Sequence, residues 1–374
     1  MAGIYIHIPF CRKACYYCNF HFSTQHNLLP EMIFSINKEA TIRQDYINEK
    51  VETIYFGGGT PSLLSIEDIA GILTHLKSVF IVDPEAEITL EANPDDITPD
   101  KPAAWQKIGI NRLSIGIQSF IEEDLRWMNR AHNALQAEES IKLAQNAGLN
   151  NITIDLIYGT PTLSNEDWKS NIEKALTLGV NHLSCYALTV EPKTALANFI
   201  REHKMEDVDP DKQAAHFELL VKMTEEAGFE HYEISNFAKP GFRSKHNSSY
   251  WQGKPYIGLG PSSHSFNGTS RQWNIANNAL YINSIKANIV PFEKEELTPA
   301  QQLNEYIMTS LRTIEGISLD TITLNWGTAK TTSTLKSAES FINEGLISIT
   351  NKKLQLTNKG KFLADGIAAE LFDA

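Results

Sequence analysis

Short apolar runs alternate with segments of helical periodicity along the first two-thirds of the chain. The runs are rich in β-branched residues, and six of them are interpreted as strands: Ile4–Pro9, Thr53–Phe56, Glu87–Ala92, Arg112–Gln118, Asn151–Ile157 and His182–Val190. Helical spacing marks the segments between them, notably Ser65–Val79, Glu122–Gly148 and Asn165–Leu178. This regular alternation predicts a parallel sheet with right-handed crossovers.

The largely apolar strands indicate a sheet that is covered on both faces. A doubly wound sheet and a barrel both fit the alternation. Polar residues near the ends of several successive strands favour the barrel, because the ends of curved strands converge round one mouth. We therefore predict an α/β fold, a partial (β/α)6 barrel over residues 1–238.

The pattern changes after the sixth predicted strand. A helix from Asp209 to about Gly228 and a strand over His231–Phe237 lead into a long loop rich in Gly, Ser, Asn and aromatic residues. We interpret residues 239–296 as a linker that carries a ligand motif. Residues 297–374 predict a small winged-helix-like domain of helices and two short strands, in which balanced charge favours packing or docking over DNA binding.

The composition is that of an ordinary globular protein, with 42% hydrophobic and 21% charged residues. No run of about 18 apolar residues offers a membrane span, and the first residues predict a strand rather than a secretory signal. We expect a cytoplasmic protein without a transmembrane segment, and peripheral membrane contact stays open. A net charge of −12 argues against nucleic acid as a partner, because such binding relies on clustered Lys and Arg.

Three cysteines, Cys11, Cys15 and Cys18, lie in the loop after the first predicted strand. Thiolates are the preferred ligands of iron-sulfur clusters, so the spacing favours a 4Fe-4S cluster held at three of its irons. The fourth iron is then open to an exogenous ligand. Two alternatives stay open: three unrelated buried cysteines, or a zinc site completed by Cys185 or a histidine. Cys185 itself is expected to be a small buried apolar residue.

The spacing Cys-x3-Cys-x2-Cys after a first strand resembles the signature of the radical S-adenosylmethionine (SAM) enzymes. The resemblance implies that the amino and carboxylate groups of SAM chelate the open iron. It also implies that an electron from the cluster cleaves the sulfonium bond, which gives methionine and a 5'-deoxyadenosyl radical. The fold of that family is a partial (β/α)6 barrel, in agreement with the alternation above.

Polar residues interrupt the apolar strands near their carboxyl ends. Glu91, Gln118 and Asp155 lie in the third, fourth and fifth strands, and a buried carboxylate without a partner is strongly disfavoured. We expect them to face a ligand or one another, with nearby backbone as the alternative partner. Arg130 suits a bidentate contact with a ligand carboxylate, or else a surface ion pair. The glycines at 57–59 suit close approach of a ligand or a tight turn.

Several motifs narrow the match to the oxygen-independent coproporphyrinogen III oxidase family. The chain resembles it at Tyr5-Ile-His-Ile-Pro-Phe-Cys, Phe56-Gly-Gly-Gly-Thr-Pro-Ser, Glu91-Ala-Asn-Pro, Ile115-Gly-Ile-Gln-Ser-Phe and Asp155-Leu-Ile-Tyr-Gly-Thr-Pro, and the similarity spans nearly the whole chain. The resemblance implies SAM contacts at Tyr5, Gly58, Gly59, Thr60, Glu91, Gln118, Arg130 and Asp155. It also implies that Phe20 stacks near the adenine.

Two features separate the chain from the oxidase. The oxidase continues its cluster motif to a fourth cysteine, where this chain has Phe20. In addition, His246-Asn-x-x-Tyr250-Trp251 resembles the heme-binding motif of the HemW branch, the heme chaperones. The resemblance implies that His246 is the axial ligand, with Tyr250 and Trp251 packed on the macrocycle. Judged by its residues alone, the motif also suits a surface turn, and His264 and His231 are alternative ligands.

From these motifs we expect a heme chaperone that carries a 4Fe-4S cluster and SAM, binds heme and transfers it to an acceptor protein. Its electron donor would be a flavodoxin or ferredoxin. We do not expect it to dehydrogenate coproporphyrinogen. The alternative is an oxygen-independent coproporphyrinogen III oxidase, which converts two propionates to vinyl groups by radical hydrogen abstraction.

Overall fold

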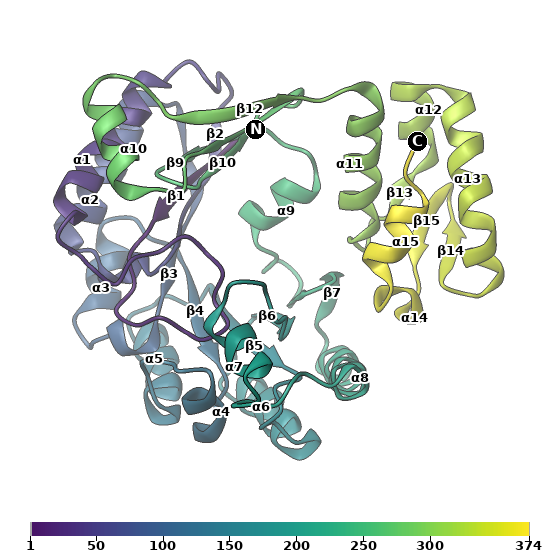
Figure 1. The fold of residues 1–374 in the computed structure, drawn as a ribbon, viewed down its shortest axis with the longest axis horizontal. Coiled ribbons are helices and arrows are strands. Elements are labelled where there is room, and N and C mark those ends of the chain that lie inside the picture. The colour runs from purple at the N-terminus through teal and green to yellow at the C-terminus, as the bar shows by residue number, and fades with distance from the viewer. Residues whose placement is uncertain (1, 374) are drawn as a thin grey trace.

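The computed structural model describes residues 2–373 and contains six parallel strands that curve into a partial barrel (Figure 1). They are β1 (Ala2–Ile8), β2 (Val51–Gly58), β3 (Val82–Ala92), β4 (Arg112–Gln118), β5 (Ile152–Tyr158) and β6 (His182–Ala187). Each strand pairs with the next one along the chain. All residues of β4 are buried, as expected for a strand covered on both faces. The predicted α/β fold is confirmed.

Helices connect these strands and lie outside the curve of the sheet (Figure 1). They are α1 (Leu29–Ile42), α2 (Ile66–Val79), α3 (Lys101–Lys107), α4 (Glu122–Trp127), α5 (Ala134–Asn146) and α6 (Asn165–Thr177), with short 3-10 turns η1 (Pro61–Leu63) and η2 (Pro94–Asp96). Ser65 and Ser164 cap α2 and α6 by accepting hydrogen bonds from backbone N–H groups of the first turn. The apolar helix faces pack on the strands and form the main core.

The single helix predicted over Glu122–Gly148 is two helices in the structure. The backbone turns at Asn129, whose φ of 60° is left-handed, so α4 ends before it. Asn133 then begins α5 with a capping box shared with Gln136. The turn between the two helices carries Arg130, which therefore lies in a loop at the barrel mouth.

Strands from later in the chain extend both edges of the sheet to twelve strands, in the order β12-β11-β10-β9-β1-β2-β3-β4-β5-β6-β8-β7. Before them come α7 (Ala195–Arg201) and α8 (Pro210–Glu226). The added elements are β7 (Glu230–Glu233), β8 (Asn236–Ala238), α9 (Lys245–Trp251), β9 (Tyr256–Leu259), β10 (His264–Phe266), β11 (Ser270–Asn274), α10 (Asn278–Lys286) and β12 (Phe292–Glu296). Residues 239–296 therefore differ from the expected linker, because four of their segments pair into the main sheet.

The C-terminal residues form a second unit with a core of its own. Its elements are α11 (Pro299–Leu311), β13 (Ile317–Ser318), α12 (Leu319–Trp326), α13 (Thr328–Asn343), β14 (Ile347–Thr350), β15 (Lys353–Leu356), α14 (Asn358–Lys361) and α15 (Ala364–Glu370). The three strands form a separate antiparallel sheet in the order β13-β15-β14. Figure 1 shows this unit, in light green and yellow, beside the open side of the barrel, with α11 toward α9.

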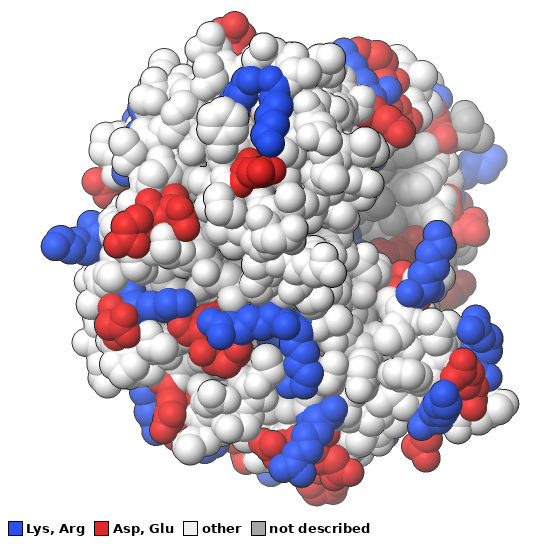
Figure 2. All heavy atoms as spheres, turned by 60° about the vertical axis from the view of Figure 1, so that its left-hand side comes forward, with Lys and Arg blue, Asp and Glu red and all other residues white. Residues whose placement is uncertain are grey.

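Charged side chains of both signs are mixed on the surface. On the face drawn in Figure 2, Lys and Arg are interspersed with Asp and Glu. Within residues 2–373, every helix is too short or too polar to span a bilayer.

Candidate functional site

A cavity of about 490 Å³ lies at the carboxyl ends of β2 to β5, below the loop that follows β1. We call it the cluster cavity. The three cysteines line it together with every predicted SAM contact except Tyr5, namely Phe20, Gly58, Gly59, Thr60, Glu91, Gln118, Arg130 and Asp155. The structure thus brings residues from six separate segments of the sequence to one mouth, as strand curvature predicts.

Cys11, Cys15 and Cys18 are half-buried thiols, and no disulfide joins them. Backbone hydrogen bonds hold their loop, from Cys11 N–H to Ser23 O at 3.0 Å and from Cys18 N–H to Cys15 O at 3.3 Å. Burial, with the neighbouring cysteines, raises the pKa of Cys11 to about 11. Burial also raises the pKa of Cys18.

The zinc alternative finds no support among residues 2–373, where no group of three or more His, Cys, Asp or Glu side chains converges on a single ion position. Cys185 is 2% exposed within β6, paired through its backbone, and lies outside the cluster cavity.

Gly58 and Gly59 join the end of β2 to the cysteine loop by close packing. A Cβ at Gly59 would lie 2.6 Å from the carbonyl oxygen of Phe10 and 2.9 Å from that of Ile8. Gly58 has a φ of +109°, and a Cβ there would meet the ring of His7 at 2.7 Å. The close approach of the β1 backbone therefore requires Gly59, and the positive φ and the His7 ring require Gly58, whether or not a ligand also contacts them.

Arg130 joins the cysteine loop to the barrel mouth. Its Nη1 donates to Cys15 Sγ at 3.2 Å, and its Nη2 donates to Asn93 Oδ1 and to the Gly116 carbonyl, both at 2.8 Å. Its Nε is buried without a hydrogen-bond partner in the described chain. Among residues 2–373 no carboxylate forms an ion pair with Arg130, so this cation at the cavity wall suits an anionic ligand.

Two carboxyl groups face this cation across the cavity. Glu91 accepts a hydrogen bond of 2.8 Å from the Tyr55 hydroxyl, and burial raises its pKa to about 8. Burial also raises the pKa of Asp155, to about 6, against the lowering effect of Arg112 and Arg130. Both groups hold protons more readily than usual, and a bound cation would favour their charged forms.

Gln118 ends β4 with a φ of 65°, where the register of pairing with β5 shifts. This backbone turn explains how its side chain reaches the mouth from a buried strand. Tyr17, which the sequence reasoning missed, also lines the cavity, and its hydroxyl lies 3.5 Å from Arg130 Nη1. Its position between Cys15 and Cys18 is the only sequence signal that could have indicated it.

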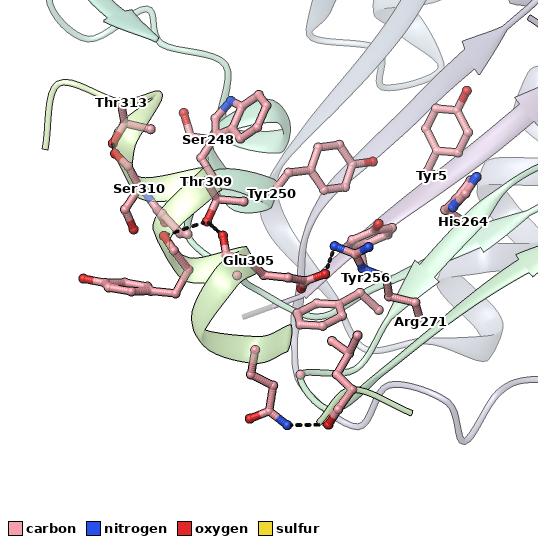
Figure 3. Close-up of a pocket in the computed structure, with 18 of the residues that line it drawn as sticks. Tyr5, Ser248, Tyr250, Tyr256, His264, Arg271, Glu305, Thr309, Ser310 and Thr313 are labelled. Atoms are coloured by element: carbon pink, nitrogen blue, oxygen red, sulfur yellow. Dashed lines mark hydrogen bonds and ion pairs between the residues drawn. The ribbon is translucent and has the colours of Figure 1, made fainter. Parts of the chain in front are cut away.

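A second cavity of about 1080 Å³ lies between the barrel and the C-terminal unit. We call it the interdomain cavity. Its walls come from β1, β9 to β11, α9, α11 and α12, as the close-up in Figure 3 shows in part. Nine aromatic side chains contribute to the lining: Tyr5, Phe20, Tyr232, Tyr250, Trp251, Tyr256, Phe266, Tyr306 and Trp326. The exposed ring of Phe20 and the adjacent Asn19 line both cavities, so the two share a wall.

His246 lies behind this second cavity rather than in it. Its Nδ1 is 2.8 Å from the Thr53 hydroxyl and its Nε2 is 2.7 Å from the Tyr250 hydroxyl. The ring is 1% exposed and stacks on Tyr55, and burial, with Arg112 nearby, lowers its pKa to about 3. Both ring nitrogens are engaged within the chain, so its role as a heme ligand stays a prediction that requires Tyr250 to move.

Sequence comparisons agree with this architecture. The Radical SAM superfamily model matches residues 5–175, and the HemN C-terminal domain model matches residues 297–363. The protein named heme chaperone HemW in Mycobacterium tuberculosis is 33% identical over 99% of this chain and 94% of its own length. The HemW of Bacillus subtilis is 32% identical over 98% of both chains.

A solved structure shares the whole fold. Coproporphyrinogen III oxidase (HemN) of Escherichia coli, described as a radical SAM enzyme, superposes with a TM-score of 0.87 over 99% of this chain and 90% of its own, at 22% identity. At that identity the likeness shows the fold alone. The two sequence relatives above carry more weight, and on their similarity over nearly full length the chain belongs to the HemW family of radical SAM proteins.

Proposed function

We propose that this protein is a heme chaperone that binds heme in the interdomain cavity and passes it to an acceptor protein. One observation carries the proposal: an aromatic-lined cavity of about 1080 Å³ shares the wall at Phe20 with the cluster cavity. Cavities for small ligands range from about 300 to 1,000 Å³ and are mostly apolar, which suits a flat macrocycle of heme size. The names of the relatives support the same reading.

In the cluster cavity we infer a 4Fe-4S cluster on Cys11, Cys15 and Cys18, with SAM beside it. Arg130 would bind the SAM carboxylate, while Glu91 and Asp155 would face the cationic part of the molecule. When bound, these groups supply one-electron chemistry, fed by a donor such as a flavodoxin or ferredoxin. The protein's own part is to hold the ligand against Gly58 and Thr60 at the barrel mouth. We place this function in the cytoplasm.

The experiment distinguishes a heme carrier from a coproporphyrinogen III oxidase. Anaerobically reconstituted protein is loaded with heme, separated from free heme, and mixed with an apo-hemoprotein, and transfer is followed by the acceptor's spectrum. A parallel sample receives coproporphyrinogen III, SAM and reductant. We expect saturable heme binding and transfer, with no vinyl products. Turnover of coproporphyrinogen would make the chain an oxidase, and a failure to bind heme would remove the chaperone proposal.

A further inference from the structure

Three histidines line the interdomain cavity: His7, His21 and His264. His7 is buried, with its Nε2 2.9 Å from the His21 carbonyl and its Nδ1 3.2 Å from the Tyr5 hydroxyl. His21 has its Nε2 2.7 Å from Asn278 Oδ1. His264 differs from both, because within residues 2–373 no hydrogen bond engages either of its ring nitrogens.

The position of His264 suits coordination of a flat ligand. It begins β10, its side chain is exposed to the cavity, and its ring stacks on Trp273 with centroids 6.3 Å apart and planes 29° apart. This ring contact leaves both imidazole nitrogens without a hydrogen-bond partner among the described residues. Figure 3 shows His264 beside Tyr5 and Tyr256 on the same wall.

The charge state of this ring also suits a metal. Loss of hydration, together with the nearby Arg271, lowers the pKa of His264. A neutral imidazole is the form that ligates iron, because its lone pair is then available. Arg271 is ion-paired to Glu305 of α11 and lines the same cavity as His264.

From this geometry we propose that His264 supplies the axial imidazole to a heme iron in the interdomain cavity. The proposal rests on the proposed heme-binding function and names the residue that performs it. A nitrogen of His264 donates its electron pair to the iron, and no covalent bond of the protein breaks. His246 then acts as a positioning residue, since its hydrogen bonds orient the ring of Tyr250 and brace α9 against Thr53 of β2.

The test is a titration of ferric heme into the full, cluster-loaded chain, followed by difference spectra in the Soret region. The variants are His264→Ala, His21→Ala and His246→Ala, with His75→Ala as the control because His75 lies in α2 and lines neither cavity. We expect His264→Ala to shift the Soret maximum and to weaken heme binding about tenfold or more. Added imidazole should restore the wild-type spectrum of that variant alone.

The other three variants should keep the wild-type Soret maximum because none of them removes the ligand, but only His75→Ala, which lines neither cavity, should also keep the wild-type heme affinity. The proposal would be overturned if His264→Ala kept the wild-type Soret spectrum and heme affinity. It would also be overturned if His21→Ala or His246→Ala shifted the Soret maximum and added imidazole restored it. Iron and sulfide content and SAM binding report whether each variant is folded. If the wild-type chain binds no heme, the proposed function itself fails, whereas heme binding that ignores His264 removes only this inference.

Discussion

Arg130 links two structures that are far apart in the sequence, the cysteine loop and the end of β4. One guanidinium contacts Cys15, Asn93 and the carbonyl of Gly116 at once. A planar group with five donors can hold three such partners and still present a further N–H to a ligand, which an ammonium cannot do with the same geometry.

We expect Arg130→Ala to raise the dissociation constant of SAM about 10- to 100-fold, because a charge-assisted hydrogen bond contributes about 1.5 to 3 kcal/mol. Arg130→Lys should recover only part of the loss. Equilibrium dialysis of SAM, normalised to cluster content, measures the effect. Arg126→Ala is the control, since Arg126 is 77% exposed and pairs only with Glu122. Unchanged SAM affinity in Arg130→Ala would remove this residue from the site.

The buried carboxyl group of Glu91 should make the stability of the protein depend on pH. Burial raises its pKa to about 8 from an ordinary value of 4.5, so the folded chain binds this proton more tightly than the unfolded chain. The resulting stabilisation is complete at acidic pH and is lost as the pH rises toward about 8. We expect the Tm of Glu91→Gln, relative to wild type, to increase between about pH 5 and pH 9 in SAM-free protein. Thermal unfolding across that range measures it, and a constant difference would contradict the assignment.

The sequence singled out Glu91, Gln118 and Asp155 because polar side chains near the ends of apolar strands are a strong signal, and all three line the cluster cavity. It could not place Tyr17 or orient His246. An aromatic residue between two cysteines has no periodicity to interpret, and the hydrogen bonds of His246 to Thr53 and Tyr250 depend on how α9 docks on β2. Only tertiary packing decides whether such a histidine faces a cavity or the core.

Among the elements, the six central strands were predictable, whereas the break between α4 and α5 was not. Helical periodicity continues through Asn129, and the left-handed turn there shows in the sequence only as an Asn followed by a capping box. Strands β9 to β12 were also missed, because short segments rich in Gly, Ser and aromatics resemble loops until their partners are known.

Variants of Asn129 test the break between the helices. Asn129→Ala removes the 2.8 Å hydrogen bond from the Asn129 side chain to the Ala14 carbonyl. It also leaves an alanine in the left-handed conformation at this position, without a side-chain hydrogen bond to offset the strain. Asn129→Gly removes the same hydrogen bond, but glycine adopts the left-handed conformation without strain. We expect Ala to be less stable than Gly by about 1 kcal/mol, measured by denaturant unfolding. Equal stability of the two variants would show that the turn relaxes without strain.

At the scale of the molecule, the C-terminal unit closes one side of the interdomain cavity. Arg312 is the main polar link: its guanidinium lies 3.3 Å from the buried Glu233, 2.6 Å from Asp365, and 5.3 Å above the Trp251 ring. Two further ion pairs join the units, from Arg243 to Glu315 at 2.7 Å and from Arg271 to Glu305. The cavity therefore depends on contacts between units with separate cores.

We expect Arg312→Ala to lower the free energy of unfolding by about 2 kcal/mol, because it leaves the buried Glu233 carboxylate without its charged partner. It should also speed proteolysis between the two units and weaken heme binding. Lys352→Ala is the matched control, since its pair with Asp320 is exposed and lies within the C-terminal unit. If both variants behave like wild type, Arg312 is not what holds the units together.

The position of β1 has a consequence for synthesis on the ribosome. This first strand pairs with β2 on one side and with β9, residues Tyr256–Leu259, on the other. At a synthesis rate of about 5 to 20 residues per second, the ribosome makes β9 roughly 10 to 50 seconds after β1. During that time the strand that precedes the cysteine loop presents an apolar edge with unpaired N–H and C=O groups, which can pair with another chain. The nascent protein needs this edge shielded until β9 arrives.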